Sequence, residues 1–231
     1  MHVSIIIPAL NEAACIERTL KSLQHQARPF EIIVADGGSG DATATIAKQY
    51  ATVVHAKRGR ANQMNAGAAA SSGDVLLFLH ADSKLPPDGL SQIRETLTQK
   101  AESGTFRLQF DTSSPLLGFY SFFTRFRLPK FSFGDRGLFV KRSLFDELGG
   151  FAAIPIFEDL EIVQRLHKRG SFTFLPSYVT TAARRFEQHG YLKQQLLNGY
   201  LWLSYQLGNS PESLASRYRY NTCSSPVEDI D

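Results

Sequence analysis

The chain has 231 residues, of which 43% are hydrophobic and 20% are charged, proportions that are ordinary for a globular protein. These values exclude a disordered or fibrous chain, and the length suits one domain with a core of normal size. The formal net charge of +3 is mildly basic. Such a charge suits a phosphorylated substrate or an anionic membrane surface, and no nucleic-acid partner is expected.

The apolar segments and the cysteines do not indicate a membrane-spanning or disulfide-rich protein. The apolar run at residues 3–8 is too short for a signal peptide or a membrane span, and no stretch of about 18 apolar residues occurs. Cys15 and Cys223 lie far apart without CxxC spacing, so neither a disulfide framework nor a cysteine zinc site is indicated. We therefore expect a cytoplasmic protein with reduced thiols; peripheral attachment to the inner face of the membrane is an alternative.

The first half of the sequence alternates between strand and helix patterns. The predicted strands are 3–7, 31–35, 52–54 and 75–79, and the predicted helices begin at Asn11 and span 41–50 and 60–71. Continuous apolar strands separated by amphipathic helices predict an α/β fold, with a mostly parallel central sheet and helices on both faces. In such a sheet the carboxyl ends of the strands share one edge, and ligands bind there.

The second half is less regular. Residues 115–133 are rich in Phe, Leu and Arg but have poor periodicity, whereas 158–168 and 190–207 predict helices. The chain turns polar after Gly208 and is expected to fray by about Cys223. Since no repeat or linker divides the chain, we expect a single domain over 1–209, with halves 1–110 and 111–209, followed by a tail at 210–231.

Two polar clusters follow the first two predicted strands. After the first, the chain has Pro8-Ala9-Leu10-Asn11-Glu12 in place of the G-x-G-x-x-G of nicotinamide and flavin enzymes, which disfavours dinucleotide chemistry. A helix cap is the alternative role for Asn11 and Glu12. After the second strand, Asp36 and a glycine turn can accept hydrogen bonds from a ribose or a base, or the loop can simply cap the next helix.

Two further acidic clusters suit a metal ion and a general base. His80-Ala81-Asp82 follows the most apolar strand, where a buried strand needs no metal-capable side chains. A divalent cation that bridges diphosphate oxygens needs few protein ligands, so Asp82 can suffice; a plain strand-end turn is the alternative. Glu158 and Asp159 open a helix, where acids either favour the helix dipole or serve as a general base.

Two basic clusters complete the set of candidate residues. Lys57-Arg58-Gly59-Arg60 precedes a predicted helix, and Arg184-Arg185-Phe186 follows a predicted strand. Guanidinium groups pair well with phosphates, so either cluster can neutralise a diphosphate. Solvated surface patches are the alternative.

The order of these clusters resembles that of the family 2 glycosyltransferases. That family carries a P-x-x-N-E opening, an aspartate-glycine turn after the second strand, a D-x-D motif after the fourth and a downstream E-D motif. The corresponding segments here are 8–12, 36–39, 80–82 and 158–159, and the resemblance spans roughly 3–190. It is greatest to a compact bacterial subgroup with H-A-D and a late R-R-aromatic motif.

The resemblance implies a single GT-A (Rossmann-like) domain and an inverting, metal-assisted transfer from a UDP-sugar or other nucleotide diphosphate sugar. It makes 1–110 the nucleotide-sugar half and 111–209 the acceptor half. Asp159, with Glu158 beside it, would deprotonate the acceptor, and Asp82 and His80 would hold Mn²⁺ or Mg²⁺. The implied nucleotide-binding residues are Pro8, Ala9, Asn11, Glu12, Asp36, Gly37, Arg58, Arg60, Asn65, Ala81, Arg184 and Arg185.

One position departs from the family pattern. His80 stands where the first aspartate of D-x-D is usual. An imidazole can still ligate a metal or donate a hydrogen bond, but the site has one negative charge fewer, which weakens its hold on a cation.

The acceptor and the competing functions stay open at this level. Residues 116–127 mix aromatics with cations and, like the helix at 191–207, suit an interfacial segment beside a lipid-linked acceptor, a homodimer face, or ordinary packing. A sugar nucleotidyltransferase is an alternative, but the G-x-G-x-R loop that it needs is absent. A non-catalytic nucleotide-sugar-binding protein is another, and it would need no acid at Asp159.

Overall fold

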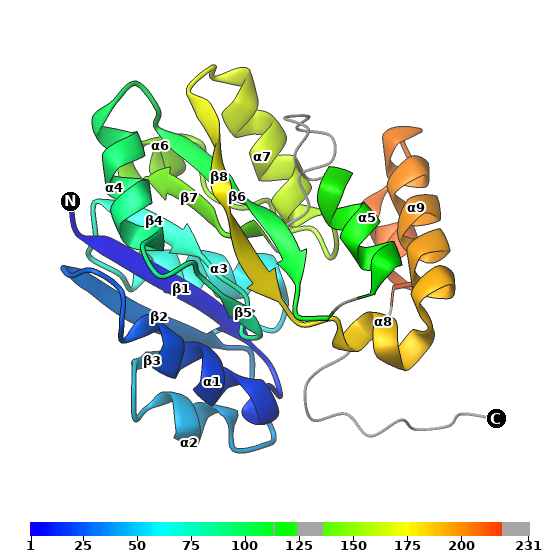
Figure 1. The fold of residues 1–231 in the computed structure, drawn as a ribbon, viewed down its shortest axis with the longest axis horizontal. Coiled ribbons are helices and arrows are strands. Elements are labelled where there is room, and N and C mark those ends of the chain that lie inside the picture. Colours follow the sequence, from blue (N-terminus) through cyan, green and yellow to red (C-terminus); the bar gives the residue numbers. More distant parts are fainter. Residues whose placement is uncertain (113, 124–135, 219–231) are drawn as a thin grey trace.

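A mixed sheet with helices on both faces forms the centre of the computed structural model, which describes residues 1–112, 114–123 and 136–218 (Figure 1). Within these residues the sheet has eight strands in the order β3-β2-β1-β4-β7-β6-β8-β5. Strands from the two halves of the sequence are neighbours in this order, since β4 lies beside β7. Loops from both halves can therefore lie along one edge of the sheet.

The first four strands along the chain, β1 to β4, are parallel to one another. β1 (Val3–Ala9) pairs with β2 (Phe30–Asp36) on one side and with β4 (Val75–Phe78) on the other, and β3 (Thr52–His55) pairs with β2. β1, β2 and β4 are almost entirely buried, because helices cover both faces of the sheet. The continuous apolar runs in the sequence therefore predicted these three strands correctly.

A single reversed strand joins this half to the second half. β7 (Leu138–Lys141) is antiparallel to β4 and to β6 (Ser103–Phe110), so β6 runs in the direction of β1 again. β8 (Phe172–Thr181) is parallel to β6, and the short β5 (Ser83–Lys84) is antiparallel to β8. The predicted fold class, mostly parallel with helices on both faces, is confirmed, and β6 and β8 end at the same edge as β1.

Two hydrophobic clusters lie on opposite faces of the sheet. Ile5 packs with Leu20 on one face, and Ile6 packs with Met64 and Val163 on the other, because successive strand residues point to opposite sides. The helices that contribute to these layers are α1 (Ala13–Leu23), α2 (Thr43–Ala47), α3 (Arg60–Ala69), α4 (Gly89–Thr98), α6 (Arg142–Glu147) and α7 (Glu158–Lys168).

The remaining helices lie beside the sheet, at the right of Figure 1. They are α5 (Pro115–Phe123), α8 (Arg184–His189), α9 (Tyr191–Gln206) and α10 (Pro211–Ala215). Leu117 of α5 packs with Phe186 of α8, and Leu201 of α9 packs with Leu214 of α10. α10 thus falls within the segment predicted as a tail, and the division of the chain into 1–209 and 210–231 stays a prediction.

Several details differ from the sequence expectations. The predicted helix at 41–50 forms only over α2, and of the irregular segment 115–133 the structure describes α5, while 124–135 lie outside the described residues. The expectation of reduced thiols is wrong at Cys15, which is disulfide-bonded; Cys223 lies outside the described residues. None of the helices in the described ranges has the length and apolar character needed to span a bilayer.

Candidate active site at the sheet edge

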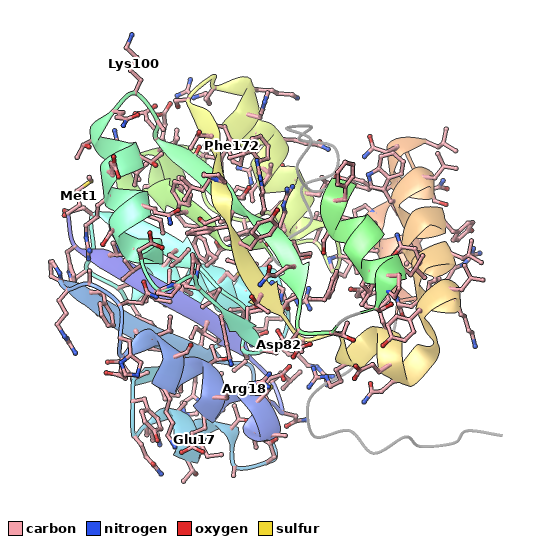
Figure 2. The ribbon with its side chains drawn as sticks, viewed as in Figure 1. Met1, Glu17, Arg18, Asp82, Lys100 and Phe172 are labelled. Carbon is pink, nitrogen blue, oxygen red and sulfur yellow. The ribbon has the colours of Figure 1, made fainter. Side chains whose placement is uncertain are left out.

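The loops after β1, β2, β4 and β8 meet at the edge where these strands end. Ala9 pairs with Asp36 at the last position of β1 and β2, and Ser83 pairs with Thr181 at the last position of β8. Asp82 lies at this edge, close to the start of α8 (Figure 2). The prediction that the polar clusters after the strands share one edge is therefore confirmed for Asp36 and Asp82.

Asp36 is buried at the end of β2 and organises the turn that follows it. Its carboxylate accepts hydrogen bonds from the backbone N–H of Gly38 and Ser39, each at 3.2 Å, and from Ser39 Oγ at 2.5 Å. His55 Nδ1 lies 3.8 Å from Asp36 Oδ2. In the same loop, the Asp41 carboxylate accepts from the N–H of Thr43 at 2.9 Å, whereas the N-cap position of α2 is Ala42 and has no side-chain cap.

Asn11 joins the loop after β1 to the loop after β2. Its backbone has φ of 53°, its N–H donates to Ser39 Oγ at 2.9 Å, and its Oδ1 accepts from the N–H of Gly40 at 2.8 Å. The Glu12 side chain makes no capping hydrogen bond to α1. Asn11 therefore holds the loops after β1 and β2 together, and Glu12 Oε2 lies near both Cys15 Sγ and Arg184 Nη1.

Gln63 is a buried residue of this edge that sequence reasoning missed. Its Nε2 donates to the carbonyls of Ala9 at 2.7 Å and Ala35 at 3.0 Å, so the side chain bridges the ends of β1 and β2. A Cβ on Gly37 would lie 2.9 Å from Gln63 Nε2, which explains why a glycine follows Asp36. The available signal was a glutamine on the side of an alanine-rich helix that faces the sheet.

Asp82 and His80 lie in a turn after β4 that α1 and β8 hold in place. The N–H of Ser83 donates to the carbonyl of His80 at 3.1 Å, and Thr19 Oγ1 donates to the carbonyl of Ala81 at 2.8 Å. Asp82 Oδ1 lies 3.4 Å from Thr181 Oγ1. The carboxylate is thus held between the loop after β4 and the end of β8.

Arg184 reaches two of these acids from the start of α8. Its Nη2 lies 3.8 Å from Asp82 Oδ2, and its Nη1 lies 3.6 Å from Glu12 Oε2. The position of Arg184 depends on Asp111 at the end of β6, because Asp111 Oδ1 accepts from the N–H of Ala183 at 2.8 Å. Sequence reasoning found Arg184 but missed Asp111, which lies in no recognisable motif.

The other predicted nucleotide-binding residues surround this edge. Ala9 and Ala81 are buried beside Asp36 and Asp82. Arg58 is exposed, and Arg60 is half-buried at the first position of α3; both follow β3, where the N–H of Ala56 donates to the carbonyl of Asp36. Pro8 and Gly37 complete the strand ends. Arg185 belongs to α8, but its side chain lies outside the described part of the structure.

Asn65 binds the backbone of Phe151 with both atoms of its side-chain amide, a contact that the sequence did not indicate. Its Nδ2 donates to the carbonyl of Phe151 at 2.9 Å, and its Oδ1 accepts from the N–H of Phe151 at 2.9 Å. Gly150 lies against the same amide, since a Cβ there would be 2.7 Å from Asn65 Oδ1. Asn65 therefore anchors the segment that precedes α7, and its role toward a nucleotide stays a prediction.

Glu158 and Asp159 are both buried in the first turn of α7. Phe157 begins this turn in the left-handed conformation, with φ of 65°, and its ring stacks on Tyr205 at 4.8 Å between centroids. α7 leads directly into β8, which ends at the same edge as β1, so the first turn of α7 lies toward that edge (Figure 1). The role of Asp159 as a base stays a prediction.

The acids at this edge suit a divalent cation that takes most of its ligands from a bound diphosphate and only one or two from the protein. In the described ranges, no group of three or more His, Cys, Asp or Glu side chains is arranged to bind a metal by itself. Asp82 nevertheless offers hard carboxylate oxygens at the edge, and Glu12 shares the same arginine with it. A magnesium-type site with one or two carboxylates and substrate phosphates needs no more than this.

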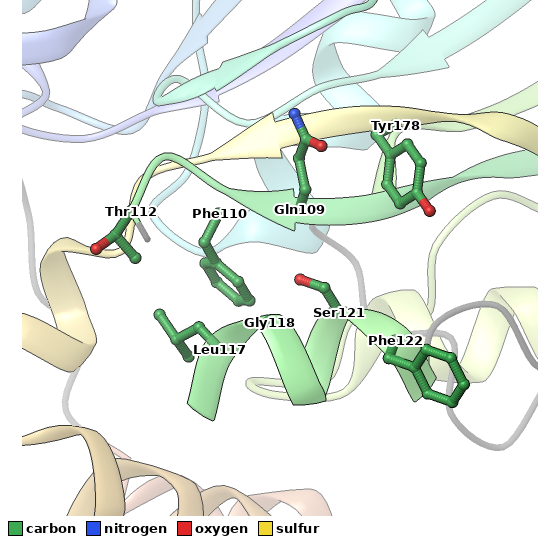
Figure 3. Close-up of a pocket in the computed structure, with 8 residues that line it drawn as sticks. All are labelled: Gln109, Phe110, Thr112, Leu117, Gly118, Ser121, Phe122 and Tyr178. Carbon is green, nitrogen blue, oxygen red and sulfur yellow. The ribbon is translucent and has the colours of Figure 1, made fainter. Parts of the chain in front are cut away.

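A pocket of about 310 Å³ lies between α5 and the ends of β6 and β8 (Figure 3). Phe110 and Leu117 form its apolar wall, and Gln109, Ser121 and Tyr178 bring polar groups to it. The strand residue Phe110 directly precedes Asp111, which positions Arg184. A residue that lines the pocket is therefore the sequence neighbour of the acid that holds the start of α8.

Comparison with solved structures identifies the fold class. The structure superposes on a mannosyltransferase, PcManGT from Pyrobaculum calidifontis in complex with GDP-Man and Mn²⁺, with a TM-score of 0.69 and 19% identity, covering 94% of this chain and 65% of that one. It also superposes on S. aureus TarS 1-349 in complex with UDP-GlcNAc, with a TM-score of 0.65 and 17% identity over 79% of this chain and 58% of that one. These proteins have the GT-A fold, and so does this chain.

The sequence comparison then identifies the family. The model of Glycosyl transferase family 2 matches residues 4–155, and the chain belongs to that family. Its relatives include the glycosyltransferase AglE of Haloferax volcanii, 28% identical over 169 residues, or 64% of this chain. The chain spans 55% of the length of that relative. The predicted membership of the family 2 glycosyltransferases is thus confirmed, and the subgroup with H-A-D stays a prediction.

Proposed function

We propose that this chain transfers a sugar from a nucleoside diphosphate sugar, specifically a UDP-sugar, to an acceptor with inversion at the anomeric carbon. The observation that carries the proposal is the meeting of Asp36, Asp82 and Arg184 at one edge of the sheet. Membership of the family and the nucleotide sugars bound by the two structural neighbours support it.

Asp36 is the proposed contact for the ribose or uracil of the donor. A carboxylate has about four acceptor positions, and three donor groups from the turn already bind Asp36. Acceptor capacity therefore remains for a ribose hydroxyl or the N–H of a base. Asn11 and Gln63 keep the two flanking loops in register, and Glu12 is proposed to lie beside the nucleoside.

Arg184 is the proposed partner of the donor diphosphate. Its guanidinium already lies within 4 Å of two carboxylates, which shows that it can reach the position between Glu12 and Asp82. An arginine there gives bidentate hydrogen bonds to phosphate oxygens and neutralises the charge that develops on the leaving group. A Mn²⁺ or Mg²⁺ ion held by Asp82, with His80 next to it, would supply Lewis-acid stabilisation of that diphosphate.

The chemical step is a single displacement. The acceptor hydroxyl oxygen attacks C1 of the sugar, the C1–O bond to the diphosphate breaks, and Asp159 takes the hydroxyl proton. UDP departs with the electron pair of the broken bond, so the configuration at C1 is inverted. The burial of Asp159 and Glu158 in the first turn of α7, the helix that precedes β8, supports this assignment.

The pocket between α5 and β6 is the proposed acceptor site. Its apolar wall of Phe110, Leu117 and Phe122 suits an amphiphilic acceptor, and a lipid-linked one fits best. The polar groups of Gln109, Ser121 and Tyr178 would hold the end of the acceptor that reacts. An acceptor seated there would enter from the side of α5 and reach the charged edge past Phe110 and Asp111.

Product analysis tests the proposal. The protein is incubated with UDP-sugars and Mn²⁺, and NMR follows nucleotide release and the anomeric configuration of the released or transferred sugar. We expect UDP and a sugar of inverted configuration, even if water is the slow acceptor. Release of UMP and sugar phosphate would contradict the proposal, and donor binding without any turnover would indicate a non-catalytic binding protein.

A further inference from the structure

The outer face of α9 is apolar, although helices normally present polar residues to water. The exposed side chains include Leu192, Leu196, Tyr200 and Leu203, with Leu207 directly after the helix, and they are 48–76% exposed. At about 100° per residue, these five positions fall within an arc of about 80°. We call these five residues the α9 stripe.

The buried face of the same helix is partly polar. Gln194 and Ser204 are buried there, together with Leu201. Leu197 and Leu201 still pack inward against α10, so α9 carries leucines on both faces, whereas a helix that only covers a core presents polar residues to water. An uncovered stripe of leucines is unfavourable in water, so the stripe points to a partner that is itself apolar.

The charges beside the α9 stripe are positive. α9 has no Asp or Glu, and its one charged residue, Lys193, is exposed next to Leu192. At the middle of the stripe, the guanidinium of Arg217 contacts the Tyr200 hydroxyl and lies 5.6 Å from the centre of its ring. The acid of α10, Glu212, lies on a separate helix. Leucines, a tyrosine and flanking cations are the composition of a helix that lies on an anionic bilayer.

The size of the stripe favours a bilayer over a second copy of the chain. A standard protein–protein interface uses about 20–30 residues on each side, whereas the stripe has five on a single helix about 24 Å long. A lipid surface has no such requirement, because it needs neither shape complementarity nor further contacts. Leu116 and Phe122 of α5 are also exposed, and Leu117 of α5 packs in one cluster with Tyr191 of α9.

We propose that the α9 stripe docks the protein on the surface of an anionic lipid bilayer. The inference does not rest on the proposed transferase activity, because it concerns binding to lipid in the absence of any donor. If the transferase proposal is also correct, docking would bring the α5–β6 pocket close to an acceptor that is held in the membrane.

Vesicle flotation tests the inference. The full chain is mixed with vesicles of phosphatidylcholine alone or with added phosphatidylglycerol, and the bound fraction is measured after flotation. We expect binding to the anionic vesicles. Leu196→Glu/Leu203→Glu should lower the partition coefficient at least about tenfold, since each leucine buries a full side chain in lipid.

The matched control adds the same two charges on α4, at the opposite side of the molecule (Figure 1), as Ser91→Glu/Thr98→Glu; these positions are exposed. The control should bind vesicles as the wild type does. Absence of wild-type binding, or equal binding by the α9 variant, would overturn the inference. So would a wild-type dimer in light scattering that the α9 variant converts to a monomer, because the stripe would then belong to a second copy.

Discussion

Arg184 and Asp82 form an ion pair of 3.8 Å between the two halves of the chain. Arg184 also lies 3.6 Å from Glu12, so one guanidinium neutralises an acid from the loop after β1 and another from the loop after β4. The guanidinium therefore offsets the repulsion between these two carboxylates. In the proposed function, the same guanidinium would turn to the phosphate oxygens of the donor, which would free Asp82 for a metal ion.

The first prediction concerns this arginine. Arg184→Gln should weaken UDP binding at least about tenfold in calorimetry, because a charge-assisted hydrogen bond to phosphate contributes about 1.5–3 kcal/mol. Arg184→Lys should recover part of the loss. Arg169→Gln removes an exposed arginine that pairs with Glu147 and should bind UDP as the wild type does. Equal affinities for Arg184→Gln and wild type would remove Arg184 from the donor site.

The second prediction concerns the metal. Asp82→Ala should abolish the part of donor affinity that depends on Mn²⁺, since Asp82 is the proposed carboxylate ligand. Calorimetric titration of UDP with and without Mn²⁺ measures this difference. Asp146→Ala, an exposed acid of α6, is the control and should keep the wild-type response. If Mn²⁺ strengthens UDP binding equally in Asp82→Ala and wild type, Asp82 is not the ligand.

The third prediction separates the two kinds of acceptor. Asp159→Asn should slow transfer by about 10²–10⁴-fold if the acceptor is a hydroxyl, which is the usual contribution of a general base. Steady-state rates with a defined acceptor measure the loss, and the control is Asp88→Asn, at an exposed acid directly before α4. A loss below about tenfold with intact folding would reject the base role and favour a phosphate acceptor, which is ionised already.

The fourth prediction concerns stability and pH at the opposite end of β2. Burial alone would raise the pKa of Glu31, but hydrogen bonds from Ser4 Oγ at 2.7 Å and from Ser72 outweigh it and lower the pKa. A pKa lowered by folding stabilises the protein above the unfolded value of about 4.3, and this contribution is lost as pH falls through the folded pKa.

Glu31→Gln should therefore destabilise the protein by about 1–2 kcal/mol at neutral pH and flatten the loss of stability below about pH 4.3. Urea unfolding at a series of pH values measures both effects. Glu95→Gln, an exposed acid of α4, should follow the wild-type curve. A Glu31→Gln curve parallel to wild type would show that the hydrogen bonds do not perturb this carboxyl.

The strands of the first half could be predicted because local pattern and tertiary environment agree. Val3–Ala9 and Val75–Phe78 are buried on both faces, so every position is apolar except for Ser4, and the run is visible in the sequence. β8 contains Pro176 and many half-buried polar residues, and its pairing with β6 is irregular between Thr105 and Arg107. The sequence of β8 therefore shows no alternation of polar and apolar residues, and the strand order of the second half could not be predicted.

The residues of the candidate site also fall into two groups, those that the sequence could predict and those that it could not. Asp36 and Asp82 were predictable because they follow strands whose ends must share an edge. Gln63 and Asp111 were not, because their partners are backbone groups remote in sequence: the carbonyls of Ala9 and Ala35, and the N–H of Ala183. Such contacts leave no motif, since many side chains can bond to a carbonyl or an N–H and the partners are fixed only by the fold.

A thermal-shift panel tests most directly whether a sugar nucleotide binds at this edge. Wild type and Asp36→Ala are melted with UDP-, GDP- and TDP-sugars and Mn²⁺, since a donor that binds only the folded state raises the melting temperature. UDP-sugars should stabilise the wild type and should no longer stabilise Asp36→Ala. No shift with any of the donors, or the same shift in both proteins, would contradict a donor site at Asp36.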